Sequence, residues 1–146
     1  MSEENKTIVA GYFAEAIDKR NADILGKFFA QDCVVHRPEA SAPIVGLENL
    51  KQALGRLVDT YSEFTTTIHD LFASGDRVTC RFSHRAVNRG DWKSRIGHHS
   101  VAGREVNWSA IAIFRIRDGK IAEEWVCRDE LGMLISLGVL PRSPAP

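Results

Sequence analysis

The sequence lacks the features that mark several large classes of protein. Cysteine is scarce: Cys33, Cys80 and Cys127 lie far apart, without a C-x-x-C pair. An odd number of widely spaced cysteines indicates neither a disulfide framework nor a cysteine-rich zinc site. No run approaches the roughly 18 apolar residues of a membrane-spanning helix, and the start of the chain lacks a signal-peptide pattern. We therefore expect a protein of the reducing cytoplasm that does not enter a membrane.

An excess of charge of either sign is also missing. Lys and Arg together number 19, as do Asp and Glu, so the formal net charge is +0. Binding to nucleic acid or to anionic lipid relies on a concentration of basic residues, so neither partner is expected. The dispersed histidines show no H-x-x-x-H spacing, and no metal site is predicted. The partner class that remains is a small molecule of little charge.

Three helices are predicted before most of the strands. The first has an apolar stripe at helical spacing, which consists of Val9, Tyr12, Phe13, Ala16 and Ile17. Asn21 can cap a short second helix around Leu25. Gly46 precedes a third helix, whose leucine stripe begins at Leu47.

Beyond Phe64 the pattern changes to the period of two that is typical of strands. Residues 78–84 alternate between apolar and polar side chains, with Phe82 and His84 on the apolar side. The polar segment over 90–103 predicts a loop long enough to be functional. A further strand over 105–117 places Trp108 and Phe114 on its apolar face.

The end of the chain carries a hairpin signal followed by a carboxylate. Asp118-Gly119 between two apolar runs is typical of a type I′ turn, because both central residues need a positive φ. If the second strand is regular, alternation places on its inner face Ile121, Glu123, Trp125, Cys127 and Asp129. A final helical turn is expected over 131–137.

Helices followed by long strands with one polar face indicate an α+β domain. We expect a cone-shaped, curved antiparallel (mixed) sheet with three N-terminal helices packed on its concave face, enclosing a pocket. A chain of 146 residues matches one domain, and such a domain buries roughly 68–70% of its unfolded surface. The expected domain covers 1–146, with a core over about 6–138 and a tail over 139–146.

Several motifs together resemble one family. They are G-R-E-V-N-W ending at Trp108, I-F-R-I-R-D-G-K-I ending at Ile121, and E-W-x-x-x-D-x-x-G, which runs from Glu124 to Gly132. This combination resembles the SnoaL-like polyketide cyclases, which belong to the nuclear transport factor 2-like superfamily together with ketosteroid isomerases and limonene epoxide hydrolase. The resemblance implies closure of a ring in a polyketide ester or related polycarbonyl compound by intramolecular aldol condensation, without metal or cofactor. It also implies a homodimer or higher homo-oligomer, joined through the outer face of the sheet, in natural-product biosynthesis.

The resemblance implies that Asp129 is the catalytic acid/base. Judged from the residues alone, Asp129 is equally suited to cap the helix that begins near Leu131. Several family members carry a pocket histidine on the preceding strand where this chain has Ala112. His36 and His84 are therefore the candidates for a second catalytic group, and ordinary strand packing is the alternative for both.

A flat aromatic substrate would stack on aromatic side chains of the cavity. The candidates for substrate binding are Trp125, Trp108, Tyr12, Phe114 and Phe82. Aromatic side chains on inner faces are more often part of the core, which is the alternative interpretation.

Two other functions fit the same fold. Epoxide opening or double-bond isomerisation would use the same pocket, and limonene-epoxide-type chemistry would need an acid, an arginine and a second acid gathered in it. A non-catalytic dimeric module that binds a small ligand is the third possibility, because fold does not determine function. In that case Asp129 would be a helix cap.

Overall fold

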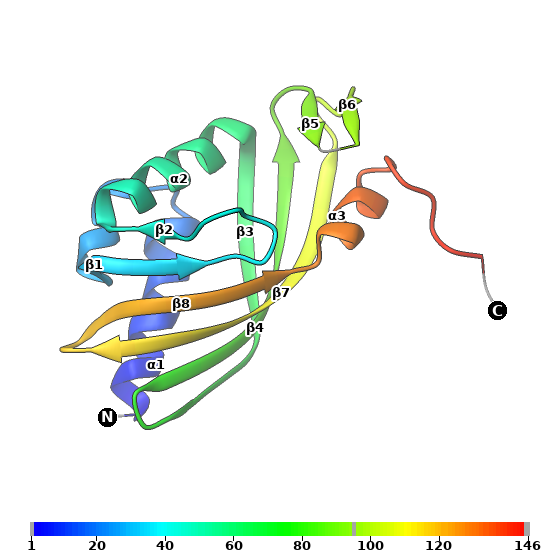
Figure 1. Ribbon diagram of the computed structural model, residues 1–146. Coiled ribbons are helices and arrows are strands. Elements are labelled where there is room, and N and C mark those ends of the chain that lie inside the picture. Colours follow the sequence, from blue (N-terminus) through cyan, green and yellow to red (C-terminus); the bar gives the residue numbers. More distant parts are fainter. Residues whose placement is uncertain (1, 95, 145–146) are drawn as a thin grey trace.

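The largest element of the computed structural model, which describes residues 2–94 and 96–144, is a mixed six-stranded sheet (Figure 1). Its strands, in spatial order, are β2 (Ile44–Val45), β1 (Phe29–His36), β8 (Lys120–Arg128), β7 (Glu105–Arg117), β4 (Arg77–Asn88) and β3 (Tyr61–Ser74). β1 runs parallel to β8, and the other neighbouring strands are antiparallel. The long strands bend strongly, so the sheet has a concave and a convex face.

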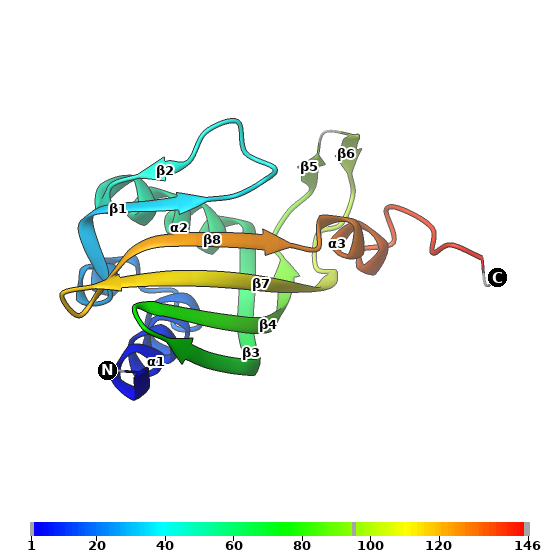
Figure 2. The same cartoon turned by 60° about the horizontal axis from the view of Figure 1, so that its bottom comes forward.

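Three helical segments cover the concave face, as predicted (Figures 1 and 2). α1 (Ser2–Gly11) continues into the π-helical segment η1 (Tyr12–Ile17), and the predicted apolar stripe of these two segments is buried. The short 3-10 helix η2 (Ala22–Lys27) begins after Asn21, whose side chain accepts a hydrogen bond from the backbone N–H of Asp23. α2 (Leu47–Thr60) follows Gly46 and buries its leucine stripe at Leu47, Leu50 and Leu54. No described helix is long and apolar enough to cross a membrane.

The segment predicted as a long polar loop contains a small hairpin. β5 (Trp92–Ser94) and β6 (Gly97–His99) pair with each other and project beyond the ends of β4 and β7 (Figure 1). Trp92 and His99 are partners across the two strands, so their side chains lie on the same side of the hairpin. Their ring centroids are 6.2 Å apart. The hairpin therefore holds Trp92 in a defined direction.

The predicted turn between β7 and β8 is present, but β8 is not a regular strand. Asp118 and Gly119 have φ values of 52° and 74°, as a type I′ turn requires. Arg115 pairs with Glu123 whereas Ile116 pairs with Ile121, so Ala122 is an additional residue on β8. Such a β-bulge moves every later side chain of the strand to the opposite face.

The inner face predicted for β8 is therefore wrong beyond Ile121. Glu124 is buried, with 5% of its surface exposed, whereas Cys127 is exposed. Glu124, Val126 and Arg128 share the concave face, and Trp125 lies on the convex face opposite the exposed Ile113. β8 then ends at α3 (Glu130–Ser136), where the final helical turn was predicted.

Candidate active site

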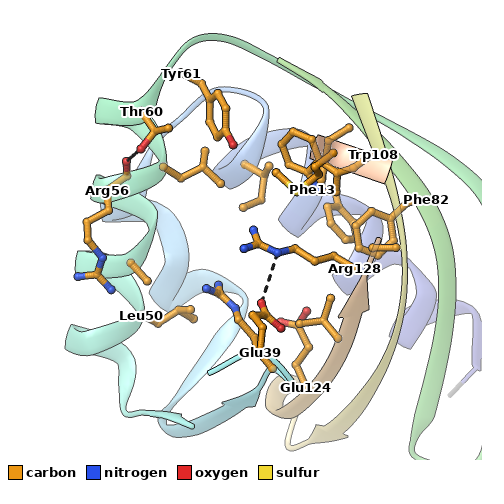
Figure 3. Close-up of a pocket in the computed structure, with 18 of the residues that line it drawn as sticks. Phe13, Glu39, Leu50, Arg56, Thr60, Tyr61, Phe82, Trp108, Glu124 and Arg128 are labelled. Carbon is orange, nitrogen blue, oxygen red and sulfur yellow. Dashed lines mark hydrogen bonds and ion pairs between the residues drawn. The ribbon is translucent and has the colours of Figure 1, made fainter. Parts of the chain in front are cut away.

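A cavity of about 280 Å³ lies between the concave face of the sheet and the helices that cover it (Figure 3). Six aromatic side chains contribute to its wall: Tyr12, Phe13, Tyr61, Phe82, Trp92 and Trp108. Its ionisable side chains are Arg37, Glu39, Arg56, His84, Glu124 and Arg128. An enclosed wall that combines aromatic rings with ionisable groups suits the binding of a small molecule.

His84 lies inside the aromatic wall. Its ring centroid is 4.7 Å from that of Phe64, 5.1 Å from that of Phe82 and 5.2 Å from that of Trp108. Burial, with a smaller contribution from the positive charge of Arg128, lowers the pKa of His84 to about 3. His84 is therefore neutral at physiological pH, because the charged imidazolium would be poorly solvated there.

The hydrogen bonds of His84 define which of its ring nitrogens carries the proton. Thr66 Oγ1 donates to Asp18 Oδ1 at 2.6 Å and lies 3.0 Å from His84 Nδ1. Since the single hydroxyl proton is directed to Asp18, Nδ1 of His84 is the donor to Thr66. The neutral ring then presents the lone pair of Nε2, which can accept a hydrogen bond from a ligand hydroxyl.

Glu124 is the buried carboxyl group of the cavity. Burial raises its pKa from 4.5 to about 7, and the positive charge of Arg37 opposes this rise. The Tyr12 hydroxyl beside it has a pKa well above 10, first because of burial and then because of the charge of Glu124. A carboxyl group with a pKa near 7 can both accept and release a proton at neutral pH.

Arg128 reaches into the cavity from the same face of β8 (Figure 3). Its Nε lies 3.3 Å from Glu39 Oε1, and a terminal guanidinium nitrogen lies 3.6 Å from Glu130 Oε1. The Glu39 contact is an ion pair without hydrogen-bond geometry, because the buried Nε–H has no acceptor in the part of the chain that the structure describes. Glu39, Arg128 and Glu124 thus form a cluster of two acids and an arginine, which we name the Glu-Arg-Glu cluster.

Four of the eight predicted site residues line the cavity: Tyr12, Phe82, His84 and Trp108. A fifth, Phe114, is fully buried behind the wall and packs edge-on against Tyr12 and Phe13. It belongs to the core, which was the alternative interpretation for the aromatic candidates.

Trp125 and His36 lie on the convex face instead: the bulge at Ala122 turns Trp125 outward, and His36 follows the buried Val35 on β1 and so faces the other way. They are neighbours on the parallel strands β8 and β1, and their rings stack with centroids 5.5 Å apart. His36 Nε2 lies 2.6 Å from Glu123 Oε2, and Arg77 lies over the Trp125 ring. The expectation that Trp125 and His36 border the cavity is wrong.

Asp129 is the N-cap of α3, as its alternative interpretation predicted. Its Oδ1 accepts a hydrogen bond from the backbone N–H of Gly132 at 2.8 Å. The carboxylate borders a second hollow, whose lining also includes Ser83, Ser109 and His84. Asp129 does not line the aromatic cavity, and it shares only this second hollow with His84.

The sequence interpretation did not identify Glu124, Arg128, Arg37 or Glu39 as site residues. The first two are charged residues that regular alternation assigned to solvent. The adjacent apolar residues Ile121 and Ala122, both buried, were the available signal for a bulge next to the turn. Within residues 2–94 and 96–144, no three His, Cys, Asp or Glu side chains gather closely enough to ligate a metal ion.

Comparison with solved structures identifies the same fold in several proteins. TsrD from Streptomyces laurentii is 23% identical, with a TM-score of 0.79, and the match covers 94% of this chain and 97% of TsrD. IdmH from Streptomyces antibioticus, described as a candidate polyketide cyclase, is 25% identical with a TM-score of 0.79, over 92% of this chain and 99% of IdmH. An LEH-like epoxide hydrolase from M. tuberculosis is 18% identical with a TM-score of 0.73, over 93% and 90% of the two chains.

Comparison of the sequence with protein families gives the more specific assignment. No curated protein sequence matches this chain. The family described as SnoaL-like polyketide cyclase matches residues 7–137, which include every strand of the six-stranded sheet and both sides of the cavity. The chain belongs to the SnoaL-like polyketide cyclase family.

Proposed function

We propose that this protein is a cofactor-independent acid/base enzyme that closes a ring in a polyketide-type polycarbonyl compound by intramolecular aldol condensation. The observation that carries the proposal is Glu124, a buried carboxyl with a pKa of about 7 inside an aromatic cavity. Membership of the SnoaL-like family supports the reaction class. Natural-product biosynthesis is the corresponding setting.

In the proposed reaction, ionised Glu124 removes a proton from a methylene group flanked by two carbonyls. The resulting enolate carbon attacks a second carbonyl of the same molecule, a carbon–carbon bond forms, and the new alkoxide takes the proton back from Glu124. Arg37 is close enough to influence the pKa of Glu124, so its positive charge also stabilises the enolate oxygen. One carboxyl with a pKa near neutrality serves both proton transfers.

The rest of the cavity orients the substrate. Flat rings stack against Trp108 and Phe82, where offset and edge-to-face contacts accept varied substituents. Nε2 of His84 accepts a hydrogen bond from a phenolic hydroxyl, and the neutral ring does not compete with Glu124 for the proton. The cavity then promotes the aldol reaction by holding the two reacting parts of one substrate molecule close together.

The proposal is tested with Glu124→Gln and its neighbour Glu123→Gln as a matched control. Glu123 has the same side chain one residue away but faces outward, bonded to His36 and Arg115. The assay follows hydrogen–deuterium exchange at the methylene of an aryl 1,3-dicarbonyl compound by NMR, which requires only the first proton transfer. Loss of Glu124 should reduce the catalysed rate about 10²–10⁴-fold. Equal exchange rates for wild type and Glu124→Gln would refute the assignment of Glu124.

Epoxide opening is the second candidate, favoured by the Glu-Arg-Glu cluster. In this reaction protonated Glu124 donates to the epoxide oxygen while Glu39, paired with Arg128, activates a water molecule. The test uses styrene oxide in ¹⁸O-labelled water, with mass spectrometry of the diol. Incorporation of one labelled oxygen that depends on both Glu39 and Glu124 would favour this reaction over the aldol closure.

A further inference from the structure

Arg128 has a hydrogen-bond donor that the protein leaves available. Its Nε–H is buried, and the described part of the chain offers it no acceptor. The Glu39 carboxylate 3.3 Å away compensates the charge but does not lie in the direction of the N–H bond. A buried donor without an acceptor costs free energy, so this geometry favours a ligand that brings an acceptor oxygen.

The surroundings of Arg128 also favour a negatively charged ligand. Three guanidinium groups line the cavity, from Arg37, Arg56 and Arg128, and Glu39 supplies one carboxylate. Glu124 holds its proton about half of the time near pH 7, and His84 is neutral. Positive charge therefore exceeds negative charge in this partly enclosed cavity, which attracts an added anion.

We propose that the substrate carries a carboxylate, which Arg128 binds through Nε–H and a terminal N–H of its guanidinium group. Planar guanidinium and planar carboxylate match as a pair of parallel hydrogen bonds, which fixes orientation as well as charge. The inference rests on the proposed function, since it defines the substrate of the same cavity. The substrate is then a polycarbonyl free acid, and the ester that the family resemblance implies is a weaker ligand.

Glu39 acts as the competitor of the substrate carboxylate. It lies in the segment between β1 and β2, with a side chain 16% exposed, and meets Arg128 at the cavity (Figure 3). When a ligand carboxylate takes the donors of Arg128, the two acids repel each other and Glu39 turns toward solvent. Removing the charge of Glu39 should therefore strengthen the binding of an acid and leave the binding of an ester unchanged.

The test compares 3-hydroxy-2-naphthoic acid with its methyl ester, which share one ring system and differ by one charge. Fluorescence titration at pH 7 should show that the wild-type protein binds the acid about tenfold or more tightly than the ester. Arg128→Gln should abolish this preference, and Glu39→Gln should increase it. Arg77→Gln removes the same charge from the convex face and should leave the preference intact, which controls for net charge.

Two results would overturn the inference: equal binding of acid and ester by the wild-type protein, or an unchanged preference in Arg128→Gln. If Arg128→Gln does not fold, as judged by circular dichroism, Glu39→Gln decides, because an unaltered acid-to-ester ratio in that variant also refutes the competition. Failure of this inference can be distinguished from failure of the proposed function. Glu124→Gln abolishes proton transfer only if the acid/base assignment is right, whereas the preference for the acid is measured without turnover.

Discussion

Replacing Glu124 by glutamine should make the stability of the protein less sensitive to pH. Below pH about 4.5 the Glu124 carboxyl is protonated in both the folded and the unfolded chain. Between 4.5 and about 7 the unfolded chain releases this proton while the buried carboxyl keeps it. The free energy of unfolding therefore falls by about 1.4 kcal/mol per pH unit over this range, and the fall ends once both states are ionised.

The rise in pKa from 4.5 to about 7 corresponds to a total of about 3 kcal/mol. Glutamine has a similar shape and no titrating proton, so Glu124→Gln should gain up to this amount over the wild type between pH 4.5 and 8. Burial of the glutamine amide changes the free energy of unfolding by the same amount at every pH. This change cancels when the difference between variant and wild type at pH 4.5 is compared with the difference at pH 8. Urea denaturation followed by tryptophan fluorescence measures both free energies.

Glu123→Gln provides a control, because its effect on the free energy of unfolding should change with pH in the opposite direction. Hydrogen bonding to His36, followed by that to Arg115, lowers the pKa of Glu123. Its carboxylate therefore stabilises the fold above its unfolded pKa, and that contribution is lost as the pH falls through the folded pKa. The variant should be destabilised at neutral pH and approach the wild type in acid. A difference between Glu124→Gln and wild type that stays flat from pH 4.5 to 8 would refute the assignment of a raised pKa to Glu124.

Three other expectations test the placement of the remaining candidates. Trp92→Ala should weaken binding of an aromatic ligand by about 0.5–1.5 kcal/mol under conditions where the variant is fully folded, and unchanged titration curves would exclude Trp92 from the site. Asp129→Ala should cost about 1 kcal/mol of stability in urea denaturation through loss of the α3 cap, and a loss of cavity binding at full stability would contradict this role. Cys127 should react rapidly with a thiol reagent, unlike the buried Cys33 and Cys80, and protection at every protein concentration would contradict its outward direction. Protection that increases with protein concentration would support the proposal of a homodimer joined through the outer face of the sheet, where Cys127 lies.

The fold could be predicted from the sequence because each element carries a local signal of its own. The stripe from Val9 to Ile17 has helical spacing, and Asp118-Gly119 supplies the two positive φ values of the β7–β8 turn. Strand β7 has the predicted bounds, and its side chains alternate between buried and exposed along its whole length. Signals of this kind depend on a few neighbouring residues, so tertiary contacts did not alter them.

The candidate site was only partly predictable, since it depends on register as well as on pattern. Phe82, His84 and Trp108 lie on regular stretches of β4 and β7, where alternation gives the correct face. Trp125 lies on β8 beyond the bulge, where the same rule fails. The neutral state of His84 could not be predicted from the sequence either, because it results from burial among aromatic rings that separate elements contribute.

The bulge at Ala122 determines which of two adjacent glutamates can exchange a proton at neutral pH. Glu123 faces outward, where its hydrogen bonds to His36 and Arg115 lower its pKa, whereas burial raises the pKa of Glu124 to about 7. The two side chains are chemically identical, so the difference comes from their surroundings. Without the additional residue, alternation would exchange their positions, and Arg128 would leave the cavity together with Glu124. One alanine beside a turn thus sets the register on which both the proposed acid/base group and the proposed carboxylate-binding group depend.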